Sequence, residues 1–210
     1  MRENVGVKQV RAVRTRRLIL QAAAEQFDLR GYAGTPLNCV TRAAGISMGA
    51  LTFHFPTKQD LADAVQLSGI EITRDVVEQT AGLPVAPLHG ARALALSVTR
   101  LLEECTTVRA TARLTRERSG GDGWTGVWLT CLTELLRRAH DEGRLRPRVA
   151  PETFAESVLF LIMGIEEYTR CAALGTDGDS PAVRRVARAW DLLLYGALDS
   201  AGQAGGNLTK

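Results

Sequence analysis

The chain of 210 residues is 45% hydrophobic and 23% charged, which allows a buried core and is ordinary for a globular protein. Its net charge of +3 is unevenly distributed, because residues 1–60 hold nine Lys or Arg against four Asp or Glu while the remainder is slightly acidic. A basic end on a near-neutral body suits docking on phosphates, although a solvated amino-terminal tail has the same composition.

The sequence indicates neither a secreted protein nor a membrane protein. No apolar leader precedes Lys8 and Arg11, and the longest apolar stretch, residues 158–165, is far shorter than the ~20 residues of a membrane span. The four cysteines lack C-x-x-C spacing, which favours reduced thiols over a disulfide framework or a metal site. We therefore expect a cytoplasmic protein. The cysteines are Cys39, Cys105, Cys131 and Cys171.

Apolar residues recur at steps of three and four along the chain, and sustained two-residue alternation is absent. This pattern predicts an all-α fold of about nine helices. Gly31 suits a left-handed carboxyl cap, Pro36 a first helical position, and Ser47 and Thr57 amino-terminal caps. The expected ranges are 8–30, 36–44, 47–53, 57–80, 89–105, 107–118, 124–143, 151–174 and 180–200. Loops are expected at 119–123 and 175–180.

The same elements suggest a division of the chain by function. Residues 1–60 are expected to form a helix-turn-helix domain, and residues 61–200 a ligand-binding and dimerisation domain. The glycine-rich residues 201–210 are expected to form a disordered tail.

The turn Ala44-Gly45-Ile46-Ser47 joins two short helices, as in the helix-turn-helix motif. Gly45 supplies the positive φ of the turn, and Ile46 is expected to pack inward against Val40 and Leu51. Any compact pair of helices with a glycine turn has similar inner faces, so the turn alone does not decide the function.

The order of signals between Gly31 and Leu61 is more specific. The residues GY at 31–32, Thr35, AAGIS at 43–47, GAL at 49–51, FHF at 53–55 and KQDL at 58–61 closely resemble the DNA-binding region of the TetR family of bacterial regulators. The resemblance is strong over the first helix and this segment, and architectural beyond it. It implies a repressor that binds a palindromic operator in double-stranded DNA as a homodimer.

Carried over by position, the resemblance implies phosphate contacts from Thr35, Lys58 and His54. A histidine between two phenylalanines is otherwise more often a half-buried structural residue. The bases or sugars would be faced by Ser47, Met48, Gly49 and Thr52, and Arg11, Arg14 and Arg17 are candidates for further contacts from the first helix.

Two positions depart from the family pattern. The family often has Lys where Met48 stands, and usually Tyr where Thr52 stands. Base readout is therefore expected to differ, with affinity relying more on the basic first helix.

Catalytic chemistry is not indicated. His54, His89 and His140 are isolated, and nucleophile, phosphate-loop and zinc-helix motifs are absent. The adjacent pairs Glu103-Glu104 and Glu166-Glu167 point about 100° apart on a helix and cannot act as a carboxylate dyad. We expect no enzyme, no cofactor and no metal ion.

Trp124 and Trp128 lie four residues apart on one helical face. Core packing explains each of them alone, but their position also resembles the pocket of the gamma-butyrolactone receptors within the TetR family, Trp128 most closely. That resemblance implies a lactone, furan or butenolide signal and control of antibiotic biosynthesis genes. The candidate ligand-binding residues are Trp124, Trp128, Thr130, Leu132, Thr133, Leu96, Cys105 and Phe160.

Two apolar stripes on the last two helices are candidates for the dimer interface, in which two helices from each protomer would form a four-helix bundle. The stripes must also partly close the core of one protomer. They are Phe154, Val158, Leu161, Ile165 and Tyr168, and Val183, Val186, Trp190, Leu193 and Ala197. Alternative functions remain open at this point: a TetR-type regulator of efflux or metabolism with another ligand, a helical carrier of a hydrophobic metabolite, and a protein-interaction module.

Overall fold

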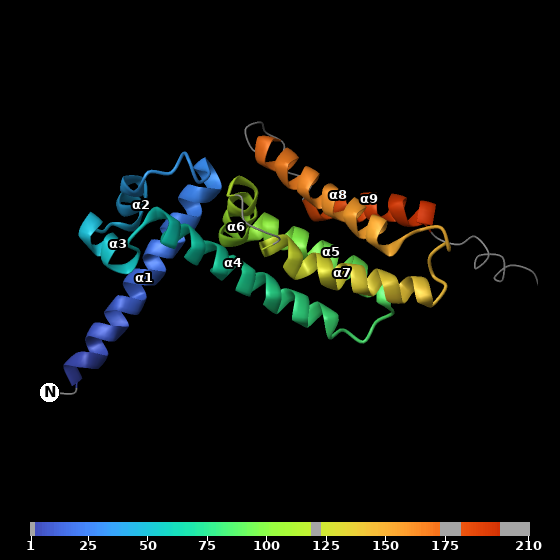
Figure 1. Cartoon of the computed structure of the whole chain (residues 1–210), viewed down its shortest axis with the longest axis horizontal. Helices are drawn as coiled ribbons and strands as arrows, with labels where there is room; N and C mark the ends of the chain where they lie inside the picture. Colours follow the sequence, from blue (N-terminus) through green and yellow to red (C-terminus); the bar gives the residue numbers. More distant parts are fainter. Residues whose placement is uncertain (1–2, 119–122, 173–181, 198–210) are drawn as a thin grey trace, which may run out of the picture. The chain divides into compact units, whose positions relative to one another are not determined.

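The computed structural model describes residues 3–118, 123–172 and 182–197, and these residues form nine α-helices (Figure 1). The bounds are α1 (Glu3–Arg30), α2 (Leu37–Ala44), α3 (Met48–His54), α4 (Lys58–Ala81), α5 (Pro87–Glu104), α6 (Thr106–Glu117), α7 (Gly123–Asp141), α8 (Pro151–Ala172) and α9 (Ala182–Ala197). The predicted all-α class is confirmed.

The helix ends follow local signals. Gly31 and Gly45 have φ of +73° and +66°, as a left-handed cap requires. Thr57 and Asp60 form a reciprocal cap before α4, because each side chain accepts the other residue's backbone N–H at 3.0 Å. Pro36 differs from expectation, since it is the cap of α2 and not its first residue. The expected tail 201–210 and most of the loops at 119–123 and 175–180 lie outside the described residues.

Two compact units divide the chain. The first contains α1, α2, α3, α4 as far as Thr73, and the segment Cys105–Thr125 with α6; the second contains the end of α4, α5, most of α7, α8 and α9. These units do not coincide with the boundary expected at residue 60, because α6 packs on α1 and joins the amino-terminal unit.

A single hydrophobic cluster holds the first unit together. Phe27, on the inward face of α1, is fully buried, and removing such a side chain from water contributes about 2 kcal/mol. The cluster continues through each packed helix. It comprises Ile19, Ala22, Ala23, Ala24, Phe27, Val40, Leu51, Phe55, Leu61, Ala62, Val65, Ala110 and Leu114, and Ile46 packs against it as expected.

The second unit is built on α5, α8 and α9, which pack on one another. The rings of Phe154 on α8 and Trp190 on α9 lie 5.4 Å apart, and both side chains are buried. The backbone N–H of Ala182 donates to the carboxylate of Glu103, which ties the start of α9 to α5. None of the nine described helices has the length and apolarity needed to cross a bilayer.

Candidate DNA interface and buried tryptophans

The turn between α2 and α3 has helix-turn-helix geometry. The backbone N–H groups of Gly45 and Ile46 donate to the carbonyls of Arg42 and Thr41, and this closes the end of α2. The Ser47 hydroxyl then accepts the N–H of Ala50 at 3.2 Å and caps α3. Leu51 is fully buried beneath α3, so the opposite face of that helix points outward.

That outward face carries the residues expected to meet DNA. Ser47, Met48, Gly49 and Thr52 are all exposed, Met48 to 43%. The Thr52 hydroxyl donates to the carbonyls of Met48 and Gly49 within its own helix, at 3.1 and 3.3 Å. The Thr52 hydroxyl proton is therefore used within the helix, and on this face the hydroxyl oxygen remains available as an acceptor.

Sequence reasoning missed Phe53, which is 81% exposed on α3. The half-buried His54 ring and the Phe53 ring lie nearly perpendicular to one another, with 5.3 Å between their centres. The sequence does contain a signal for the exposure of Phe53, because Leu51 and Phe53 are about 200° apart on a helix and cannot both face the core. Phe53 therefore adds a second exposed apolar side chain to α3, in addition to Met48.

Cations surround the same unit. Exposed arginines along α1 include Arg11, Arg14 and Arg17. Lys58 begins α4, and its ammonium lies 4.6 Å from the centre of the Tyr32 ring. The ring holds Lys58 by a cation–π contact and leaves it partly exposed. These charges suit the phosphate contacts expected of them.

Thr35 departs from expectation. Its side chain is fully buried, and its hydroxyl donates to the carbonyls of Gln26 and Gly31 at 3.0 and 2.7 Å. A phosphate contact from this side chain does not fit that burial, because the hydroxyl already closes the turn that follows α1.

The two candidate tryptophans are both buried, and they belong to different units. In the first unit, the Trp124 indole N–H donates to the Thr73 hydroxyl at 2.8 Å, which ties the start of α7 to α4. In the second unit, Trp128 and Leu132 are fully buried one turn apart. Each therefore has a packing role in this structure.

The other candidate ligand residues are less uniform. Leu96, Cys105 and Thr133 are half-buried, and the Thr133 hydroxyl donates to the carbonyl of Leu129 in its own helix. Thr130 is exposed and Phe160 is 70% exposed. Phe160 therefore does not wall a buried cavity within the protomer, because Val158 and Ile162 face the core and turn it outward.

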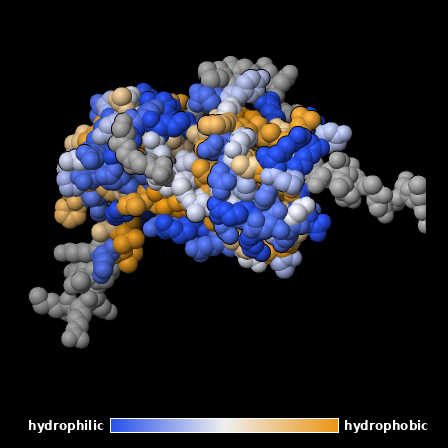
Figure 2. All heavy atoms as spheres, turned by 45° about the vertical axis from the view of Figure 1, so that its right-hand side comes forward, coloured by the Kyte–Doolittle hydropathy of each residue, from blue (hydrophilic) through white to orange (hydrophobic). Residues whose placement is uncertain are grey.

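The expected dimer stripes are divided between the core and the surface. Phe154, Val158, Val186 and Trp190 are buried within the protomer, so they close its core. Tyr168 of the first stripe faces outward, and so do three side chains of α8 and α9 that the stripes omit. The four exposed side chains are Phe160, Tyr168, Leu192 and Tyr195, each between 60% and 79% exposed. In the view of Figure 2, hydrophobic residues reach the surface among predominantly hydrophilic ones.

The thiols show no bridge among the described side chains, where Cys39, Cys105 and Cys131 are free and half-buried. Burial, together with the charge of Glu134, raises the pKa of the Cys131 thiol and keeps it protonated. No group of three or more His, Cys, Asp or Glu side chains in the described part of the chain is arranged to hold a metal ion.

Comparison with known proteins agrees with this geometry. A family model for bacterial regulatory proteins of the TetR family matches residues 19–65. The A-factor receptor protein of Streptomyces griseus is 32% identical over 162 residues, which cover 76% of this chain and 56% of that protein. The chain thus spans little more than half the length of this relative.

Solved structures match over nearly the whole chain. A gamma-butyrolactone receptor described as an ArpA-like protein has a TM-score of 0.76 and 27% identity, over 92% of this chain and 93% of that one. CprB of Streptomyces coelicolor, solved with its operator sequence, has a TM-score of 0.71 and 29% identity, over 92% and 93%. A structure concerned with the control of antibiotic production by bacterial hormones has a TM-score of 0.71 and 27% identity, over 89% and 99%.

An exposed recognition helix on an all-helical body defines a DNA-binding regulator of the helix-turn-helix class. The match over residues 19–65 assigns this segment to the DNA-binding region of the TetR family of bacterial regulatory proteins, and the likeness of the chain to gamma-butyrolactone receptors of known structure extends over both units.

Proposed function

We propose that the chain is a repressor that binds a palindromic operator as a homodimer and is released by a small signal of the gamma-butyrolactone, butenolide or furan type. The exposed face of α3 carries this proposal, because small and apolar side chains there suit close approach to base edges in a major groove. A regulator of this kind acts in the cytoplasm, where its operator lies, and does so without catalysis.

Each part of the DNA interface has its own role. Met48 and Phe53 provide apolar surface for the methyl groups of thymines, while Ser47 and Gly49 allow the backbone to approach. Phosphate contacts come from Lys58, with His54, Arg11 and Arg14 as further donors. The solved complex of CprB with its operator supports DNA binding by a chain of this fold.

The ligand is proposed from likeness and from the buried residues of the central helices. A gamma-butyrolactone receptor shares the fold over 92% of this chain, and Trp128 and Leu132 provide the apolar surface that such pockets use. Control of antibiotic production is proposed from the hormone-related structure. Outward-facing Phe160, Tyr168, Leu192 and Tyr195 are proposed to meet a second copy of the chain, because all four are large side chains on α8 and α9, which pack on one another, and apolar surface gathered on neighbouring helices is typical of an interface.

The test is a titration of the purified chain against the intergenic DNA beside its own gene, by fluorescence anisotropy at fixed salt, with and without gamma-butyrolactones. We expect tight binding that the lactone reverses. Tight binding that no lactone reverses would refute the proposed ligand class and leave the proposed DNA-binding role intact. An absence of sequence-selective binding would overturn the proposal and favour a helical carrier.

A further inference from the structure

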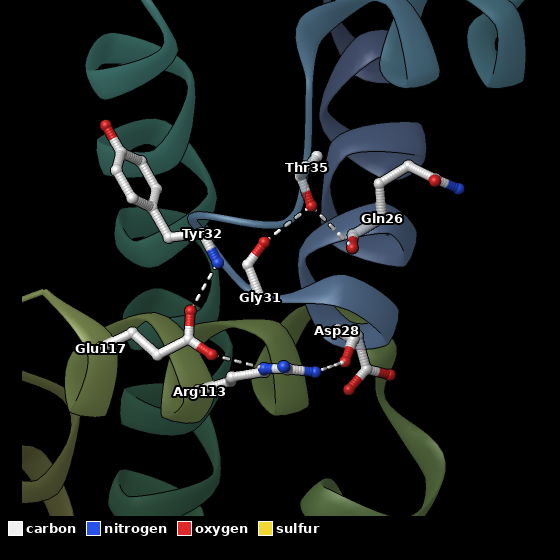
Figure 3. Close-up of polar contacts among 7 residues, drawn as sticks. All are labelled: Gln26, Asp28, Gly31, Tyr32, Thr35, Arg113 and Glu117. Carbon is white, nitrogen blue, oxygen red and sulfur yellow. Dashed lines mark hydrogen bonds and ion pairs between the residues drawn. The ribbon is translucent and has the colours of Figure 1, made fainter.

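Helix α6 holds the main chain at the end of α1 (Figure 3). The Glu117 carboxylate accepts the backbone N–H of Tyr32. The Arg113 guanidinium lies between that carboxylate and α1, and donates to Glu117 and to the carbonyl of Asp28, at 2.7 Å each. The Asp28 carbonyl lies in the last turn of α1, where carbonyls are commonly satisfied from outside the helix, and Arg113 of α6 donates to it.

The turn after α1 is closed around Gly31. Its φ of +73° favours glycine, and a Cβ at this position would overlap the Glu117 carboxylate. On the other side, the buried Thr35 hydroxyl donates to the Gly31 carbonyl. The main chain between α1 and α2 is therefore fixed from two sides.

The Tyr32 ring extends this arrangement to Lys58. The Tyr32 ring stacks on the Phe27 ring of the core, with 6.1 Å between the two ring centres. The Lys58 ammonium lies 4.6 Å from the centre of the Tyr32 ring. The guanidinium of Arg118, which follows α6, lies 5.1 Å from the same centre. Tyr32 is thus held by α6 through its backbone N–H, and its ring contacts the Lys58 ammonium at the start of α4.

We infer that Glu117, held by Arg113, is a positioning residue for DNA binding: it fixes the main chain of Tyr32 so that the Tyr32 ring aims Lys58 at a phosphate. The inference rests on the proposed DNA-binding function. It assigns to α6 a role in DNA affinity although none of its residues belongs to the recognition motif.

Charge gives this inference a sharp test, because Glu117→Ala raises the net charge by one. General attraction to phosphates would then strengthen binding. The inference predicts the opposite, an operator affinity about fivefold weaker, at the low end of couplings between sites. Glu152→Ala is the matched control, since it makes the same charge change and breaks an ion pair with Arg137 at 2.8 Å in the other unit. It is expected to leave affinity unchanged or slightly higher.

Two further variants separate positioning from general destabilisation. Glu117→Gln keeps an acceptor for the Tyr32 N–H and is expected to lie between wild type and Glu117→Ala in affinity. Tyr32→Phe keeps the ring and is expected to bind as wild type does, whereas Tyr32→Leu is expected to match Glu117→Ala. Hydrogen exchange of the peptide around Tyr32 should be faster in Glu117→Ala and unchanged in Glu152→Ala.

The decisive measurement is a double-mutant cycle with Lys58→Ala, by anisotropy well below the melting temperature. If Glu117 acts through Lys58, Glu117→Ala has no further effect on operator affinity once Lys58 is removed. Additive losses, or wild-type affinity in Glu117→Ala, would overturn the inference. Wild-type affinity in Lys58→Ala would instead refute the proposed phosphate contact, and no DNA binding by the wild type would refute the proposed function.

Discussion

Replacing Thr73 by Val tests the buried tie between α4 and α7. The Thr73 hydroxyl is fully buried and accepts the indole N–H of Trp124, which is 1% exposed, at 2.8 Å. In the variant this N–H stays buried without its acceptor, which costs about 2 kcal/mol. For a chain of this size that loss lowers the melting temperature by roughly 4–8 °C.

The assay is thermal unfolding followed by circular dichroism, with Thr80→Val as the matched control. Thr80 is also buried on α4 and donates to the Val76 carbonyl at 2.7 Å, as Thr73 donates to the Gly69 carbonyl at 2.7 Å, so the control makes the same substitution without the indole contact. The double variant Thr73→Val/Trp124→Phe should lose less than the sum of its single variants, because it removes the N–H as well. Equal melting temperatures for Thr73→Val and Thr80→Val would refute the reasoning.

Three other predictions concern the first unit. Gly31→Ala should lower the melting temperature more than Gly143→Ala, because both glycines have φ near +70° but only Gly31 faces a carboxylate; equal losses in thermal unfolding would contradict this. Lys58→Ala should weaken binding to every DNA sequence and reduce the slope of log affinity against log salt concentration by about one, whereas Phe53→Ala should change the sequence preference. Similar effects of both variants on all sequences would contradict the two roles. Burial alone would raise the pKa of Glu117, but hydrogen bonds from Arg113 and Tyr32 and nearby arginine charges lower it below 4.5. The wild type should therefore be more stable than Glu117→Gln above that pH, and this advantage should disappear as the pH falls below it. A stability difference that grows on acidification, measured by thermal unfolding against pH, would reverse that sign.

Local signals predicted the fold well. Gly31, Gly45, Ser47 and Thr57 mark helix ends because their conformations and caps depend on neighbours within a few residues. The recognition helix was found in the same way. Phe53 was overlooked because the apolar sequence around it resembles core, although the helical period turns it away from Leu51.

The network between α1 and α6 could not be predicted from the sequence. Tyr32 and Glu117 are 85 residues apart, and Arg109 and Asp28, which form an ion pair at 2.8 Å, are 81 apart. Charged residues so distant show no periodic signal, and their pairing depends on how α6 packs on α1. The division of the expected dimer stripes between core and surface was missed for a related reason, since periodicity gives the faces of a helix and does not say which face a partner covers.

Linkage between DNA and ligand tests the central claim most directly. The affinity of the purified chain for a gamma-butyrolactone is measured by calorimetry, first alone and then saturated with its operator. If the lactone releases the protein from DNA, the operator must weaken lactone binding by the same factor, typically about 5–150-fold. An equal lactone affinity in both titrations would contradict the account of a ligand-released repressor.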